Sequence, residues 1–504
     1  MDLCTCVSID GGGMTSETKT SGQRSLLRSV ARALMFGVAL VSTTAIISGA
    51  AQAQSLRDAL ASAYKYNPRL DAERARQRAT DEEVSRAHSG YRPTVMGSAD
   101  IGYERTDTRP NSTNSGETHP KGYGVTASQP IFNGFRTLNG VRVAEATVRA
   151  GRETLRNVEQ SVLLEAATAY VDVVRDQAIV KLRENNVDVL TRELKATRDR
   201  FSVGEVTRTD VAQAEARRAA AVSALDLARA NLKTSRATFE RVVGFPPSTL
   251  TEQRSPDRLL PKSLNEATEI TLKESPLVVA ALYTEQAARY TVDQVWGELL
   301  PSVSVNAAYN HRYDSSTMID EAESTTVTGQ LNVPLYQAGD VQARVRQAKH
   351  THVSRLQQIE QQRTEAKAAT ISAWSSLVAA RAQIEADQLQ VQATATALAG
   401  VREEERVGQR TLLDVLNAEQ EALNAQVQLA TTKRNLVVAS YGVLSAIGRL
   451  SIAELGNTSL AYDVDAHYHE VRRKWWGISI TRSDGHRERL DLWETYGKKH
   501  DSMK

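Results

Sequence analysis

The residue types able to carry out catalysis or hold a metal do not form a working pattern in this sequence. Three consecutive glycines at 11–13 lack the following Lys-Ser/Thr pair of a phosphate-binding loop. His350 and His352 stand two apart in a segment of helical composition, so their side chains point to different faces of a helix. We therefore expect no enzymatic activity and no cofactor.

The C-terminal tail holds the other candidate chemistry. His467 and His469 have acidic neighbours, but this pair would bind a metal only weakly, and we expect no metal site. Residues 472–476 (Arg-Arg-Lys-Trp-Trp) are basic and aromatic, which suits contact with a membrane or a protein partner. The tail over 457–504 breaks the helical pattern before it and has no counterpart elsewhere in the chain. We predict a loosely ordered extension there.

Charge and proline content limit the class of protein. The 504 residues include 62 Lys and Arg and 60 Asp and Glu, a net charge of +2, so no nucleic-acid partner is expected. All twelve prolines lie between 68 and 334, and none lies in 131–245. Because a proline inside a helix costs about 3 kcal/mol, long helices fit the proline-free stretches.

The N-terminal segment 1–53 predicts export from the cytoplasm. Within 21–53, three arginines precede a short apolar run and an Ala-Gln-Ala cleavage pattern, so we expect a signal peptide cut after Ala53. Residues 1–20 form an unusual leader, consistent with an upstream start codon. Both cysteines, Cys4 and Cys6, precede the cut, so the mature chain would have no disulfide. Nothing beyond Ala53 is apolar enough for a spanning helix, so a membrane location would require strands.

The rest of the chain contains the same pattern twice. Pro68 recurs at Pro276 after 208 residues, and later pairs such as Gly204 and Gly408 are 204 residues apart. The clearest matching blocks are 203–211 and 407–415. A unit of about 200 residues is too long for a solenoid. It is closer to the internal pseudo-symmetry of channels and transporters, and it predicts two repeats, 54–250 and 251–456.

Each repeat predicts one long helical hairpin. The tracts 134–201 and 340–405 have apolar residues at helical spacing and are rich in Ala, Leu, Glu and Arg. A glycine ends each tract and a threonine begins a second helix that runs to another glycine. The corresponding positions are Gly204 and Gly408, Thr207 and Thr411, and Gly244 and Gly448. A soluble coiled coil would give the same helical pattern.

Strands are predicted between the helical tracts, at about 94–108, 119–130, 302–313 and 324–334. Apolar and polar residues alternate in segments of about ten residues, with polar loops at 106–118 and 314–323. This alternation is typical of outer-membrane barrel strands, although a half-buried soluble hairpin shares it. Four strands cannot close a barrel, and an open edge is unstable in lipid. Transmembrane strands would therefore require an oligomer of unspecified number.

Taken in order, these features resemble the TolC-like outer-membrane efflux and secretion channels. The resemblance covers about Ser55 to Leu455 and includes the segment 59–68, the Pro-apolar-aromatic turns at 130 and 334, and the two Val-Gly-x-x-Thr-x-x-Asp-Val tips. It implies a mainly α fold of mixed class: a homotrimer with four strands per chain in a shared transmembrane β-barrel and long hairpins in an α-barrel tunnel. It also implies insertion in outer-membrane lipid and extension into the periplasm.

The same resemblance implies partners at the hairpin tips. In the family, a periplasmic adaptor (membrane fusion) protein binds the tips and connects them to an inner-membrane transporter of the RND or ABC type, which supplies the energy. The expected adaptor-contact residues lie at the two turns: Val203, Gly204, Thr207, Val407, Gly408 and Thr411.

The resemblance also implies a gate at the periplasmic entrance. It places Arg410 and Asp414 in the second hairpin, with Arg410 tied to Asp210 or Thr209 of the first, and a ring of Asp414 carboxylates that attracts cations. Two positions depart from the family pattern: Asn417 replaces a second aspartate, and Glu405 replaces a tyrosine. Glu405 would repel Asp210 unless Arg406 or Arg410 intervenes. The alternative is that Asp414 merely favours the start of a helix.

Two functions are consistent with these features. The first is a passive trimeric export duct for drugs or secreted protein. The alternative is a structural coiled-coil or adhesin-like outer-membrane protein without transport, which gives no reason for duplicated turns with acidic residues.

Overall fold

The computed structural model describes residues 55–110, 115–252, 255–481 and 487–488. The chain divides into two units, Met1–Gln52 and Ala53–Lys504, and the fold below is that of the second unit. The predicted leader and signal peptide, with both cysteines, lie outside the described residues.

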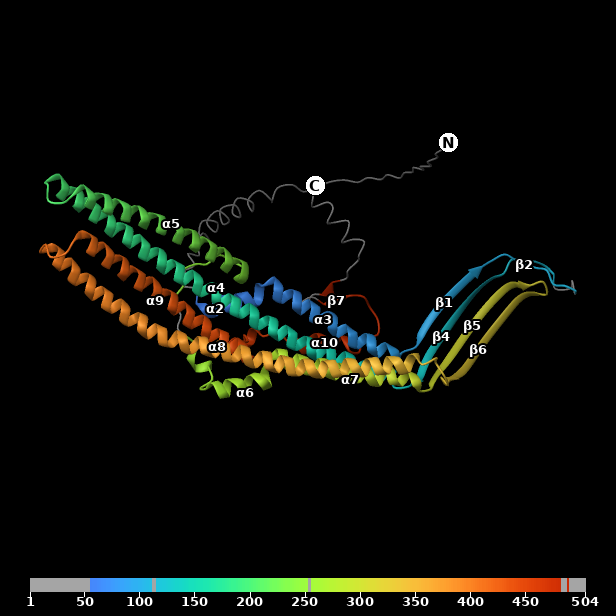
Figure 1. Ribbon diagram of the computed structural model, residues 1–504. Helices are drawn as coiled ribbons and strands as arrows, with labels where there is room; N and C mark the ends of the chain where they lie inside the picture. Colours follow the sequence, from blue (N-terminus) through green and yellow to red (C-terminus); the bar gives the residue numbers. More distant parts are fainter. Residues whose placement is uncertain (1–54, 111–114, 253–254, 482–486, 489–504) are drawn as a thin grey trace, which may run out of the picture. The chain divides into compact units, whose positions relative to one another are not determined.

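Two helices of 67 residues dominate the fold, α4 (Arg136–Ser202) and α8 (Asp340–Arg406). At 1.5 Å per residue, each is about 100 Å long. The chain then turns back into α5 (Arg208–Val243) and α9 (Leu412–Ala446), which pack against α4 and α8 respectively (Figure 1). None of these helices contains a proline, and none of the described helices has an apolar stretch long enough to cross a bilayer.

Shorter helices extend both repeats in the same way. Each repeat opens with an 11-residue helix and a 21-residue helix that begins at a proline, where the missing N–H breaks no helical hydrogen bond. These are α2 (Leu56–Tyr66), α3 (Pro68–His88), α6 (Leu264–Glu274) and α7 (Pro276–Trp296). Single turns of 3₁₀ helix lie at Ser89–Tyr91, Asp257–Leu259, Gly297–Leu299 and Thr458–Leu460.

The main hydrophobic core joins the two repeats about halfway along α4. Tyr170 of α4 and Phe239 of α5 are fully buried and pack together with Leu444 of α9. The Tyr170 hydroxyl also donates to the Thr251 carbonyl at 2.9 Å. Packing of α4 against both α5 and α9 therefore connects the hairpins at this point.

A four-stranded antiparallel sheet takes two strands from each repeat, in the order β1 (Thr94–Ile101), β4 (Lys121–Asn133), β5 (Ser302–Ser316) and β6 (Ile319–Asn332). Between β1 and β4 in the chain, β2 (Glu104–Thr106) and β3 (Gly116–Thr118) form a separate short antiparallel pair.

The register of the sheet separates apolar and polar residues onto opposite faces. One cross-strand row consists of Val95, Ala127, Ala307 and Val327, and the adjacent row of Thr94, Ser128, Asn306 and Thr328. In the polar row the Ser128 hydroxyl donates to the side-chain oxygen of Asn306 at 2.7 Å. One lipid-facing and one water-facing surface is the arrangement of a transmembrane barrel strand.

Several predicted limits of the strands were wrong. The strand predicted at 94–108 is divided into β1 and β2, and β3 lies within the predicted loop 106–118. Residues 314–323 are mostly strand, and only Thr317 and Met318 separate β5 from β6. Polar composition does not end the ladder here, because the pairs Tyr313–Glu321 and His311–Glu323 continue it and His311 Nε2 lies 2.8 Å from Glu321 on the diagonal. At the other end, β4 continues past Pro130 through a bulge. Pro130 lies beyond the last residue of β4 paired with β1, so its missing N–H breaks no bond on that side.

The predicted loose tail was wrong over its described part. Residues Val464–Val471 form α10, which contacts α3. His467 Nδ1 lies 3.1 Å from Asp81 of α3, and the Tyr462 N–H donates to the Tyr64 hydroxyl at 2.9 Å. Two short strands follow, β7 (Ile480–Thr481) and β8 (Arg487–Glu488). The partners lie on α3 and α2, nearly 400 residues earlier, where the tail sequence gives no hint of them.

Two duplicated glycines give a matched test of the fold. Gly408 and Gly448 both have positive φ, +78° and +87°, but only at Gly448 would a Cβ clash, lying 2.6 Å from the Glu274 carbonyl oxygen. Gly408→Ala should cost about 1–2 kcal/mol, the strain of a left-handed residue. Gly448→Ala should cost clearly more because the backbone near Glu274 must move. Thermal unfolding followed by circular dichroism measures both, and equal losses would contradict the packing described here.

Candidate functional site

The two hairpin tips have the same backbone geometry. At each tip the long helix ends, a valine and a left-handed glycine turn the chain, and a threonine caps the next helix. Val203 and Val407 are 77% and 67% exposed, and open space surrounds Gly204 and Gly408. The predicted contact residues thus form two equivalent exposed turns, one per repeat.

A capping box begins the helix after each turn. The Thr411 hydroxyl lies 2.8 Å from Asp414 Oδ2, and the Asp414 N–H donates back to that hydroxyl at 3.3 Å. Thr207 and Asp210 repeat these contacts. Hydrogen bonds from the Thr411 side chain and backbone lower the pKa of Asp414, so its carboxylate is charged and fixed in place. In the single chain, Asp414 therefore stabilises the start of α9, the alternative role for this residue.

The predicted tie from Arg410 to the first hairpin was wrong. Arg410 Nε donates to Glu404 at 2.9 Å, within its own hairpin, and this carboxylate raises the pKa of the guanidinium. Asp210 is already engaged by Thr207. The turn at Gly408 brings Arg410 back over the last turn of α8, where Glu404 is the nearer carboxylate.

Two other contacts connect the hairpins near the tips. Arg200 Nη1 of α4 lies 2.7 Å from Glu405 of α8, and Arg217 of α5 donates to Asn417 of α9 at 2.7 Å. We call this pair of contacts the cross-hairpin ties. Sequence reasoning missed both arginines and expected Arg406 or Arg410 to be the cation beside Glu405, but these pair with Glu403 and Glu404. One signal for the Arg200 contact was present in the sequence, namely that the Glu405 carboxylate requires a neighbouring cation if Asp210 is close.

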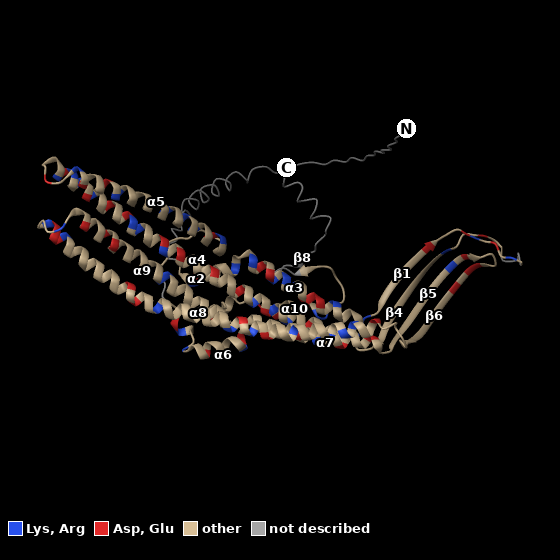
Figure 2. Ribbon diagram, viewed as in Figure 1, with Lys and Arg blue, Asp and Glu red and all other residues tan. Residues whose placement is uncertain are grey.

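A group of carboxylates lies beside these ties. Glu419 is nearly buried and pairs with Arg402 at 2.6 Å. Partial burial raises the pKa of Glu193, and the nearby carboxylates Glu419 and Glu405 raise it further. Figure 2 shows charges of both signs at both tips. Below the tips, Leu190, Ala221 and Leu416 form a small buried cluster that joins the hairpins.

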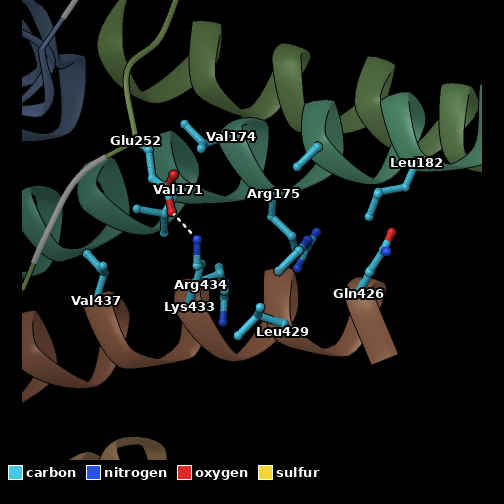
Figure 3. A pocket seen from close by; sticks show the side chains of 12 residues that line it. Val171, Val174, Arg175, Leu182, Glu252, Gln426, Leu429, Lys433, Arg434 and Val437 are labelled. Carbon is cyan, nitrogen blue, oxygen red and sulfur yellow. Dashed lines mark hydrogen bonds and ion pairs between the residues drawn. The ribbon is translucent and has the colours of Figure 1, made fainter. Parts of the chain in front are cut away.

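A second feature is a cavity of about 240 Å³ lined by α4 and α9, with Glu252 from the connection between the repeats (Figure 3). Its walls are mainly apolar, and its three cations have carboxylate partners: Lys433 binds Glu252 at 2.7 Å, Arg434 binds Asp172 at 2.8 Å, and Arg175 binds Asp176 at 2.8 Å. Of these pairs, Arg434–Asp172 joins α9 to α4 and so connects the two repeats.

Within the described ranges, no group of three or more His, Cys, Asp or Glu side chains is arranged to hold a metal ion. Of the two tail histidines, His467 contacts Asp81 and the His469 ring packs edge-on against Tyr468.

Comparison with known proteins identifies the family. The model of the outer membrane efflux protein family matches residues 59–244 and 268–449, so one match falls in each repeat. The chain belongs to this family. The outer membrane efflux protein BepC of Brucella suis biovar 1 (strain 1330) is 38% identical over 449 residues, which cover 88% of this chain and 96% of that protein.

More distant relatives agree. The outer membrane protein TolC of Escherichia coli (strain K12) is 24% identical over 426 residues, 81% of this chain and 85% of TolC. The crystal structure of the Campylobacter jejuni CmeC outer membrane channel superposes with a TM-score of 0.71 at 16% identity and covers 83% of this chain and 89% of that one. The predicted family, fold class and outer-membrane location with a periplasmic extension are thereby confirmed.

Glu193 gives a test of the electrostatics near the ties. Because its pKa is raised in the folded protein, its contribution favours the fold at acidic pH and is lost as pH rises through that pKa. Glu193→Gln should therefore raise the thermal midpoint at neutral pH and weaken its fall between acidic and neutral pH. Glu240→Gln, at an exposed position of α5, is the control and should change neither. If the thermal midpoint of Glu193→Gln follows the wild-type pH profile, the raised pKa of Glu193 in the folded protein is refuted.

Proposed function

We propose that the chain forms a homotrimeric export duct that carries substrate passively across the outer membrane, in drug efflux, type I protein secretion or both. The observation that carries the proposal is the two-faced sheet whose strands lead into 67-residue helices. A water-filled barrel needs the two-faced sheet, and a helical tunnel that continues it needs the long helices. The chain alone leaves apolar side chains of α8 uncovered, among them Val353, Val378 and Leu389, 53%, 51% and 67% exposed, and neighbouring copies would bury them.

The exposed tips suit a periplasmic adaptor. Because Val203 and Val407 lie on turns of equal geometry, one adaptor surface can bind both repeats with the same contacts. The adaptor in turn links the duct to an inner-membrane transporter of the RND or ABC type, which supplies the energy for export.

The cross-hairpin ties hold the entrance closed in this proposal. The Arg200–Glu405 ion pair is partly buried, with side chains 42% and 19% exposed, and we assign it about 0.2–1 kcal/mol, the contribution of a pair still open to solvent. Such a contact breaks readily when a partner binds and reforms when it leaves. The three Asp414 carboxylates, fixed by Thr411, would form an acidic ring that draws cations into the constriction.

Removal of one tie tests the closing mechanism. Arg200→Ala should raise the open probability of single channels in a planar bilayer by about 1.5- to 5-fold per copy, the equivalent of a surface ion pair. Arg198→Ala is the matched control, because Arg198 pairs with Glu215 inside the first hairpin and ties no second hairpin. If both variants open equally, or neither opens more than the wild type, the tie does not hold the gate.

The duplicated capping boxes allow a clean test of the acidic ring. Asp414→Ala and Asp210→Ala remove the same cap from equivalent helices, so their stability losses should match at about 1 kcal/mol. Only Asp414→Ala should lower the cation preference and the block by divalent cations. Currents measured in asymmetric salt decide the matter, and unchanged selectivity in Asp414→Ala excludes Asp414 from the pore.

A further inference from the structure

The tail presents apolar side chains that the described part of the chain leaves largely exposed. Trp475 is 68% exposed, Trp476 94% and Ile478 89%. We call these three residues the tail anchor. A contiguous exposed apolar patch of this kind marks a surface that contacts a membrane or a partner.

The tail anchor is held in place by the residues that lead into the first strand. Arg92 Nη1 donates to the Lys474 carbonyl at 2.8 Å, and the Ser85 hydroxyl donates to the same oxygen at 3.2 Å. The Arg92 guanidinium also lies 4.8 Å from the centre of the Trp475 ring. The Lys474 ammonium donates to the Ser479 carbonyl at 2.9 Å and so closes the segment into a loop.

Contacts further back keep the segment from being a free end. Arg472 contacts Glu145 at 3.3 Å, and Asp465 pairs with Arg152 at 2.7 Å, both partners on α4. Val471, at the end of α10, is 1% exposed. These contacts fix the backbone before Trp475, so the exposed tryptophans are held in place by the packing of α10 and Arg472.

These contacts place the tail anchor at the edge of the membrane. Arg92 precedes Val95, which belongs to the apolar row of the sheet, by three residues, a chain length of at most about 10 Å. This end of β1 joins the periplasmic helices, so it lies at the periplasmic surface of the outer membrane. Tryptophan is enriched at this level of membrane proteins because its ring is apolar and its N–H is polar.

The residues before the tryptophans have the complementary charge. Arg472, Arg473 and Lys474 form a continuous basic run. Basic side chains beside aromatic ones favour a surface of anionic phospholipid headgroups.

We propose that the tail anchor inserts into the headgroup region of the periplasmic leaflet of the outer membrane and contacts phospholipid there. Trp475, Trp476 and Ile478 enter the boundary between headgroups and acyl chains, and Arg473 faces the phosphates. Arg92 positions the anchor and holds it level with the start of β1. The tail thereby adds a lipid contact outside the barrel and the tunnel.

Tryptophan fluorescence of the full mature chain in liposomes tests this proposal. One variant keeps only Trp475 and Trp476 by replacing Trp296, Trp374 and Trp493 with Phe. A control keeps only Trp374, which packs against the main core. The probe is a vesicle of phosphatidylethanolamine and phosphatidylglycerol containing phosphatidylcholine brominated at defined depths. An anchor about 5–10 Å deep should be quenched at least roughly twice as strongly as Trp374, and most by the shallowest bromines.

A second variant separates positioning from folding. Adding Arg92→Ala to the two-tryptophan chain should lower bromine quenching severalfold while the circular dichroism spectrum stays that of the parent. Bromine quenching no greater than for Trp374 would overturn the proposal. Acrylamide quenching then identifies the surroundings: strong quenching means that the tryptophans face water, and weak quenching means that protein covers them. This fluorescence measurement does not depend on channel conductance, so its failure can be told apart from a failure of the proposed export function.

Discussion

The open edges of the four-stranded sheet constrain everything else in this protein. β1 and β6 lie at the two edges of the sheet and each pairs on one side only within the described chain. In lipid, an unpaired backbone N–H or C=O costs several kcal/mol, so an open sheet is unstable there. Further copies that pair β1 of one with β6 of the next remove the cost. The two-faced register then gives such a ring an apolar outside and a polar lumen.

The helices carry this ring geometry into the periplasm. Both 67-residue helices are free of proline, so each is continuous for about 100 Å, and the shorter α5 and α9 return along about half of that length. The core around Tyr170 and the pair Arg434–Asp172 connect the repeats midway. Beyond that point the described contacts between the hairpins include one small apolar cluster and the two cross-hairpin ties. The tips are therefore the part of the structure that moves at least cost.

The sequence predicted the parts of the fold that depend on local chemistry. Proline and glycine punctuation places the long helices to within two residues, because Gly204 and Gly408 must adopt a positive φ wherever the chain turns. Strand ends were predicted less well, because contacts between β5 and β6 such as that of His311 with Glu321 extend the ladder through polar residues. The Arg200–Glu405 tie joins residues 205 apart. This contact depends on the rotation of α4 and α8 about their own axes, and the spacing of apolar residues does not determine that rotation. The tail has no second copy for comparison, so α10 was missed.

Single-channel recording of the purified mature protein in a planar bilayer, with and without millimolar divalent cation on the periplasmic side, tests the central claim most directly. A duct closed at an acidic constriction should give small, cation-selective openings that divalent cations block. Folded, membrane-inserted protein that passes no ions, even when Arg200 and Arg217 are both replaced by alanine, would contradict the account and leave the protein a structural role.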